Sequence, residues 1–157
     1  MPDRTDPRRR VLIVGVYLTF ADSAIVPIVD ELRRSREWRV DQRWIAIGPE
    51  VNNAVADVTV RRQEGRAPKF ELMNDLLQTV DSTQYEFVIV CDDDITLPAG
   101  FVDRYLALVQ RYDFALAQPA RTHDSFIDHF FVEQLDGLAP GAPEDLSLGG
   151  SAEPHRG

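Results

Sequence analysis

Apolar runs and amphipathic stretches alternate along most of this chain. The run VLIVGVY at 11–17 is apolar throughout, which is typical of a central strand buried on both faces of a sheet. Residues 22–36 then predict a helix, because apolar residues recur there at helical spacing. These residues are Ile25, Ile28, Val29 and Leu32. Asp22 or Ser23 is expected to cap the N-terminus of this helix.

The same alternation continues towards residue 135. Strand patterns are found at 39–48, 57–62, 85–91 and 114–119. Helical patterns are found at 68–80, 98–112 and 124–135. The apolar stripe of the first of these three helices is expected to contain Phe70, Met73, Leu77 and Val80. That of the second is expected to contain Phe101, Tyr105 and Leu108.

Strands and helices that alternate through short loops point to one fold class. Parallel neighbouring strands need crossover connections, and helices usually supply them. We therefore expect an α/β fold, with a mostly parallel sheet and flanking helices. One domain is expected over residues 11–138, with a flexible arm at 1–10 and a disordered tail at 139–157 that is rich in glycine and proline.

The composition narrows the range of functions. The net charge of -9 argues against a nucleic-acid binder, which needs a basic face to neutralise phosphates. The single cysteine, Cys91, excludes an intramolecular disulfide and a cysteine-based zinc site, and it fits a cytoplasmic location. No apolar run reaches the roughly 20 residues that span a bilayer, so no transmembrane segment is expected.

Three aspartates follow the apolar run of the strand at 85–91. Ligands of open α/β sheets bind beyond the carboxyl ends of the strands, which is where Asp92, Asp93 and Asp94 are expected. Residues two apart share a face of an extended segment, so Asp92 and Asp94 are expected to converge while Asp93 points away. Two such carboxylates favour a cation between them. Oxygen ligands suit Mg²⁺ or Mn²⁺, which often bind the phosphates of a substrate.

A structural explanation of the acidic cluster stays open. Acidic residues at the end of a strand can cap the following helix and complement its dipole. Thr96 is expected to cap that helix just before Pro98, so capping alone does not require three aspartates. The local residues are compatible with a metal site and with a solvated turn.

The segment FVIVCDDDITLPAGFVDRYL at 87–106 resembles the Asp-x-Asp region of nucleotide-sugar glycosyltransferases with the GT-A fold. In that family an apolar strand ends in Asp-x-Asp, and a proline follows a few residues on. Upstream, APKFELMNDLL at 67–77 is similar to a family segment in which a lysine precedes a helix and an asparagine follows five residues later. Lys69 and Asn74 match this spacing. The order of strands and helices also agrees, over roughly residues 11–135.

The resemblance implies a Rossmann-like fold and a binding site for a nucleotide-diphosphate sugar. Asp92 and Asp94 would hold Mg²⁺ or Mn²⁺ against the diphosphate. The first strand and its loop would line the nucleotide pocket, and further contacts to the nucleotide sugar would come from Asp57, Lys69, Asn74 and Asp93. From the residues alone, Lys69 can also be a solvated lysine of the first helical turn, and Asn74 a plain residue of the helix surface.

A second concentration of chemical groups lies in RTHDSFIDHFF at 121–131. His123 could complete the metal shell. Asp124 or Asp128 could be the general base that takes the proton of an acceptor hydroxyl in an inverting transfer. On a helix these two aspartates, four residues apart, share one face. The structural alternative is a polar helix face beside an aromatic core stripe.

The length of the chain also bears on function. Glycosyltransferases of this fold usually need more chain after the Asp-x-Asp motif to build the acceptor site, whereas the fold-like sequence stops near Leu138. We therefore expect a C-terminally truncated product. The expected function is metal-dependent transfer of a sugar from a nucleotide diphosphate to an unknown hydroxyl acceptor. The alternative is a catalytically incomplete module that binds a nucleotide sugar or a partner.

Overall fold

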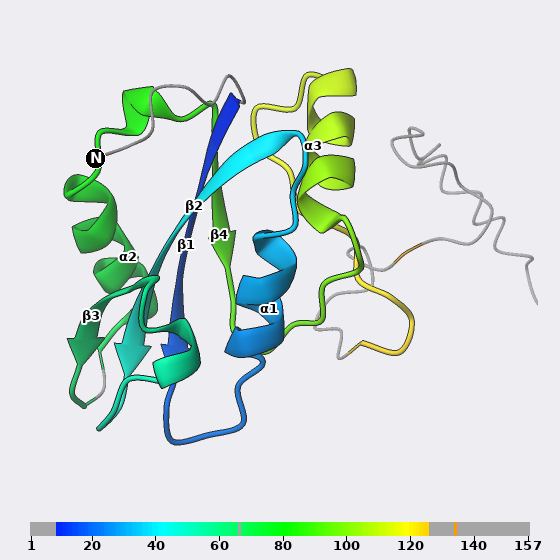
Figure 1. Cartoon of the computed structure of the whole chain (residues 1–157). Helices are drawn as coiled ribbons and strands as arrows, with labels where there is room; N and C mark the ends of the chain where they lie inside the picture. Colours follow the sequence, from blue (N-terminus) through cyan, green and yellow to red (C-terminus); the bar gives the residue numbers. More distant parts are fainter. Residues whose placement is uncertain (1–8, 66, 126–133, 135–157) are drawn as a thin grey trace, which may run out of the picture. The chain divides into compact units, whose positions relative to one another are not determined.

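A computed structural model describes residues 9–65, 67–125 and 134 (Figure 1). Its strands are β1 (Arg9–Leu18), β2 (Trp38–Ile47), β3 (Thr59–Gln63) and β4 (Phe87–Cys91). Its α-helices are α1 (Ile25–Leu32), α2 (Lys69–Gln78) and α3 (Phe101–Arg111). Two short 3₁₀ helices are η1 (Asn53–Val55) and η2 (Ser82–Gln84). The chain divides into two compact units, Met1–Leu106 and Ala107–Gly157, and each is described by itself.

β1 lies inside a four-stranded, all-parallel sheet with the order β3-β2-β1-β4. β1 pairs with β2 along its whole length, from Arg9 opposite Trp38 to Leu18 opposite Ile47. Residues 11–17 of β1 are all buried. These observations confirm the expected α/β fold and the expected central strand that is covered on both faces.

Helices cover both faces of the sheet (Figure 1). On one face, α1 and the start of α3 pack against alternate residues of the strands. The buried residues of this layer include Ile13, Tyr17, Ile28, Leu32, Trp44 and Leu106. On the other face, α2 packs on β1 and β2, and the buried residues include Leu12, Val14, Ile45, Leu72, Met73 and Leu76. Each such large apolar side chain stabilises the fold by roughly 1.5–3 kcal/mol, so these two clusters supply the main driving force.

The apolar face of α1 is confirmed, whereas the faces of α2 and α3 differ from the expected stripes. All four expected residues of α1 are at most 1% exposed. On α2 the buried residues are Leu72, Met73 and Leu76, and Phe70 is 71% exposed. On α3 the buried residues are Val102, Leu106 and Val109. Met73 is confirmed, and Leu77, Val80, Phe101 and Tyr105 are partly buried against the core. Each helix is therefore rotated only slightly about its axis from the expected face.

The flexible arm expected at 1–10 is wrong for its last two residues, because β1 begins at Arg9. The Arg9 side chain binds Glu86 and lies over the ring of Trp38. Arg10 donates to Asp41 at 2.5 Å and lies over the ring of Tyr85. Partners from distant parts of the sequence therefore extend the strand beyond its apolar run.

The start of α3 also corrects an expectation. The helix begins at Phe101, three residues after Pro98, and Thr96 is exposed instead of capping it. Gly100 precedes the helix with a φ of 68°, a conformation that glycine adopts without steric cost.

The strand expected at 114–119 is not formed. Residues of this segment pair with no strand in the described part of the chain, and Leu116 is 93% exposed. An alternating pattern predicts a strand only where a neighbouring strand is available to pair with it. Most of the helix expected at 124–135 lies outside the described residues. No helix within the described ranges is long and apolar enough to cross a membrane.

We expect Gly15→Ala to destabilise the fold by about 2–3 kcal/mol, because the added methyl group has no room. A Cβ at this position would lie 2.3 Å from the buried ring of Trp44 and 2.4 Å from the carbonyl oxygen of Cys91. Urea unfolding followed by circular dichroism measures the change. Gly65→Ala is the control, because nothing lies within 4 Å of its Cβ position and only its φ of 71° opposes the change. Equal losses for the two variants would contradict the close packing at Gly15.

Candidate functional site

The carboxyl edge of the sheet gathers the loops that carry the candidate residues. The chain leaves β1 towards β2 and β3 on one side, while β4 lies on the other side of β1. In open α/β sheets, ligands bind at such a reversal of strand order, beyond the carboxyl ends of the strands. The loop after β4, which carries the three aspartates, and the loop between β1 and α1 therefore border the expected crevice.

Asp93 joins these two loops. Its Oδ2 accepts hydrogen bonds from the backbone N–H of Leu18 and from the hydroxyl of Ser23, both at 2.8 Å. Its backbone oxygen accepts from the N–H of Ala24 at 2.7 Å. The N-cap expected at Asp22 or Ser23 is wrong, because Ala24 occupies that position without a side-chain cap. The Ser23 hydroxyl still accepts from the N–H of Ile25 at 3.3 Å. Asp93 therefore organises the crevice through its own side chain and backbone.

Asp92 and Lys69 form an ion pair that joins the end of β4 to the start of α2. α2 begins at Lys69, directly after Pro68, whose fixed φ favours a helix start. The structure thus brings together two candidate residues from two separate motifs. Asp92 contacts α2, while Asp93, which lies in a bend after β4, contacts the loop before α1.

Asp94 and Asn74 are solvent-exposed. Asp94 has no hydrogen bond or ion pair with the rest of the described chain, so its carboxylate is available to a ligand. The described contacts do not bring Asp94 to Asp92, and they do not bring Asn74 to the carboxyl edge.

The loop between β4 and α3, residues 92–100, is called the aspartate loop. Its end next to α3 is held by a buried acid that the sequence pattern did not indicate. Glu31 of α1 is 8% exposed, and its Oε1 accepts from the N–H of Gly100 at 2.6 Å. Next to it, Asp103 accepts from Ser35 and from the N–H groups of Arg36 and Glu37. Burial opposes the charge of Asp103, but these hydrogen bonds outweigh it and lower the pKa of the carboxyl. The loop is therefore held at one end by the segment before α1 and at the other end by Glu31 of α1.

A hollow of about 850 Å³ lies at the ends of β1, β2 and β3. Its walls include Leu18, Phe20, Ile47, Gly48, Arg62 and Ala67. The ring of Phe20 is 67% exposed and is available for stacking. The sequence predicts that the loop after the first strand lines a nucleotide pocket, but it gives no sign that Arg62 lies beside this loop. Arg62 lines the hollow because β3 pairs with β2, a contact between distant parts of the sequence. Lys69 and Asp92 are not among the residues that line the hollow; Ala67, two residues before Lys69, is the lining residue nearest to them in sequence.

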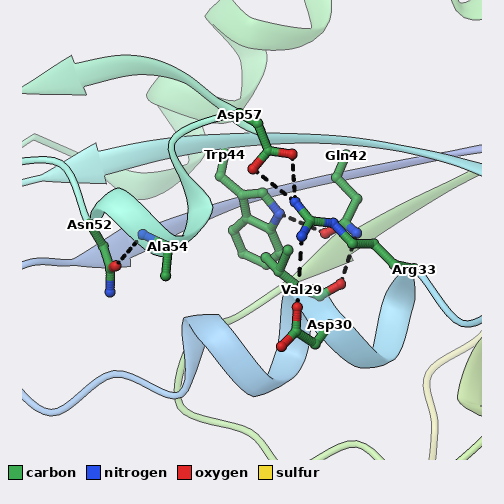
Figure 2. A network of polar contacts seen from close by, with 8 residues as sticks. All are labelled: Val29, Asp30, Arg33, Gln42, Trp44, Asn52, Ala54 and Asp57. Carbon is green, nitrogen blue, oxygen red and sulfur yellow. Dashed lines mark hydrogen bonds and ion pairs between the residues drawn. The ribbon is translucent and has the colours of Figure 1, made fainter.

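Asp57 has a different neighbour from the one expected of a nucleotide ligand. Figure 2 shows both of its carboxylate oxygens accepting from Arg33, at 2.8 and 2.6 Å. These two residues line a second hollow together with Arg10 and Tyr85, not the hollow at the ends of β1, β2 and β3. The structure therefore does not bring Asp57 to Lys69 and Asp92.

Two of the remaining candidates lie in the second unit, which is described by itself. His123 and Asp124 belong to a turn in which the N–H of Ser125 donates to the backbone oxygen of Thr122 at 2.9 Å. A hydrogen bond from the Thr122 side chain lowers the pKa of Asp124. Asp128 lies outside the described residues.

The donor atoms fit a divalent ion only in part. Within the described ranges, no three histidine, cysteine or acidic side chains are grouped so that they could hold a metal. Asp93 already uses an oxygen for the loop, which leaves Asp92 and Asp94 as donors. Mg²⁺ is usually held by one or two carboxylates, with substrate phosphates and water completing its shell. These residues therefore fit a metal that arrives with a phosphate ligand.

Comparisons with family models, curated proteins and solved structures find no match to this chain. The likeness to glycosyltransferases is therefore carried by its quoted motifs alone.

We expect Asp93→Ala to destabilise the first unit by about 2–3 kcal/mol, because two donors lose a charged acceptor. Urea unfolding measures the loss, and hydrogen exchange of the Leu18 amide locates it. Ser23→Ala is the matched control, since it removes one of the two hydrogen bonds and leaves the carboxylate in place. A loss no larger for Asp93→Ala than for Ser23→Ala, with unchanged exchange at Leu18, would contradict the anchoring role of Asp93.

Proposed function

We propose that this chain binds a nucleotide-diphosphate sugar at the carboxyl edge of its sheet, together with Mg²⁺ or Mn²⁺, and transfers the sugar to a hydroxyl acceptor. The proposal is supported chiefly by one observation. The pair of Lys69 and Asp92, the exposed Asp94 and the hollow lined by Phe20 all lie at the same edge of a parallel sheet. Of the motifs that resemble glycosyltransferases of the GT-A fold, the Asp-x-Asp segment and Lys69 fall at this edge.

Asp92 and Asp94 are the residues that would hold the metal. When bound, the ion would supply positive charge that stabilises the departing nucleoside diphosphate. Asp93 keeps the loop in place and contributes no oxygen to the ion in this proposal. Because the described residues at this edge offer two carboxylates to the ion, the metal and the diphosphate are expected to bind together.

Lys69 has two successive partners in this proposal. Without ligand, its ammonium neutralises Asp92 and relieves the repulsion within the acidic cluster. With a diphosphate bound, the ammonium is positioned at the start of α2 to contact a phosphate as a point charge. Phe20 offers a ring on which the base of the nucleotide can stack.

Transfer needs a base for the acceptor hydroxyl, and Asp124 and Asp128 are the candidates for this step. Binding without transfer is the alternative function. It is favoured by the fact that the described donor-site groups belong to the first unit, whereas both candidate bases follow residue 107. We also propose a cytoplasmic location, which is supported by the single free cysteine.

Calorimetric titration with nucleoside diphosphates and their sugars tests the proposal. We expect UDP or GDP to bind with Mn²⁺ and to bind at least ten-fold more weakly without it, because the ion neutralises the charge between carboxylates and diphosphate. Asp94→Asn is expected to abolish the metal dependence. Glu37→Gln, which removes an exposed acid just before the first residue of β2, at the opposite end of the sheet, is the charge-matched control. Absence of binding to every nucleotide, with and without the metal, would refute the proposed function.

Sugar transfer is measured separately from binding. Incubation of the nucleotide sugar with Mn²⁺ and candidate hydroxyl acceptors is followed by the release of nucleoside diphosphate. Release would support the transferase, and binding without release would support the binding module.

We expect Lys69→Ala to have opposite effects on two ligands. Loss of the ammonium frees Asp92, so Mn²⁺ alone is expected to bind several-fold more tightly. The nucleoside diphosphate with Mn²⁺ is expected to bind about ten-fold more weakly, because a charge-assisted contact to phosphate is lost. Calorimetry measures both, and Lys69→Arg is the control that keeps the charge. Parallel changes for the two ligands would contradict the exchange of partners by Lys69.

A further inference from the structure

The two edge strands of the sheet, β3 and β4, differ in the charge of their side chains. β3 carries Arg61 and Arg62, which form ion pairs with Asp75 and Glu64. β4 reads FVIVC and carries no charge. Charged side chains at the edge of a sheet prevent it from pairing with another strand, and their absence leaves the edge open to pairing. In the described part of the chain, β4 pairs with β1 alone.

One face of β4 is also left uncovered. Phe87, Ile89 and Cys91 face the core that includes α1 and the start of α3. Val88 and Val90 face the other way, and they are 42% and 53% exposed. The helix on that face, α2, packs on β1 and β2, and these two valines are not part of the buried cluster that it forms. β4 therefore exposes both an apolar face and an unpaired backbone.

The backbone groups at the open edge belong to the same two valines. The N–H of Thr19 donates to the oxygen of Ile47 in β2, so the even-numbered residues of β1 direct their backbone groups to β4. In a parallel pair of strands, a residue bonds the two neighbours of the residue that lies opposite it. The even-numbered residues of β1 lie opposite Val88 and Val90, so their backbone groups bond the odd-numbered residues of β4. The N–H and C=O groups of Val88 and Val90 therefore point away from β1.

We propose that β4 pairs in antiparallel fashion with β4 of a second copy of this chain, about a two-fold axis through Ile89. This axis sets Val88 opposite the partner's Val90, and Val90 opposite the partner's Val88. Each of these pairs exchanges two backbone hydrogen bonds, and each brings two exposed valine side chains together. The sequence of β4 is therefore complementary to itself, which is the property that an isologous interface requires.

The charges that flank β4 are already neutralised within each copy. The two-fold axis sets Glu86 opposite the partner's Asp92. Arg9 binds Glu86, and Lys69 binds Asp92, so these acids do not meet as bare charges. A pair of five-residue strands is small compared with the roughly 1,200–2,000 Å² of a stable interface, so the dimer is expected to form only at high concentration.

Sedimentation velocity from low micromolar to millimolar concentration tests the dimer. The wild type is expected to shift from monomer to dimer, and Val90→Lys is expected to stay monomeric. Val60→Lys is the matched control, because Val60 is a similarly exposed valine, at 47%, on the outer strand β3. Val88→Lys repeats the test if Val90→Lys does not fold by circular dichroism. A wild type that stays monomeric, or a Val60→Lys variant that also stays monomeric, would overturn the proposal.

A disulfide between copies tests the axis itself. In the proposed register, the Cα atoms of residue 88 and the partner's residue 90 lie about 5.5 Å apart, within the range of disulfides. A mixture of Val88→Cys and Val90→Cys is therefore expected to cross-link under mild oxidation far faster than either variant alone. Cys91 does not interfere, because its thiol is buried in the core. Equal cross-linking of each variant alone would exclude this axis. The proposal does not rest on the proposed function.

Discussion

All four strands of the sheet run parallel, and the rest of the structure depends on this constraint. A tight hairpin cannot join parallel neighbours, so the chain must cross over the sheet between them. It does so through α1 on one face and α2 on the other (Figure 1). The crossovers bring the carboxyl ends of all four strands to one edge. For this reason Lys69 and Asp92, 23 residues apart in sequence, meet there.

The three neighbouring aspartates each have a different environment in the folded chain. Asp92 is paired with a lysine, Asp93 accepts hydrogen bonds from a loop, and Asp94 is exposed to water. The repulsion that the sequence suggests is therefore largely absent in the folded chain. The carboxylates still act on the thiol of Cys91, because Asp93 and Asp94 add to the effect of burial in raising its pKa.

Much of the fold could be predicted because its signals are local. The apolar run of β1, the four buried residues of α1 and the bounds of β2, β3 and β4 to within two residues follow from hydrophobic periodicity. The rotations of α2 and α3 could not be predicted in this way. Each helix carries two overlapping apolar stripes, and only the surface on which it packs selects one of them. The prediction of a strand at 114–119 is wrong for a related reason. Its alternating pattern gives no information about whether a partner strand lies beside it.

The candidate site could likewise be predicted only in part. Residue types and their spacing were enough to predict that acids follow an apolar strand, that a lysine begins a helix, and that such groups lie at one edge of a parallel sheet. The contacts of Lys69 with Asp92, of Asp93 with the loop before α1, of Glu31 with Gly100 and of Asp57 with Arg33 are known from the folded chain alone. The difference arises from the distance along the chain over which each signal acts. Periodicity and residue type act over a few neighbouring residues, whereas the choice among ionic partners is made by whichever oppositely charged group the packed sheet brings within a few ångströms.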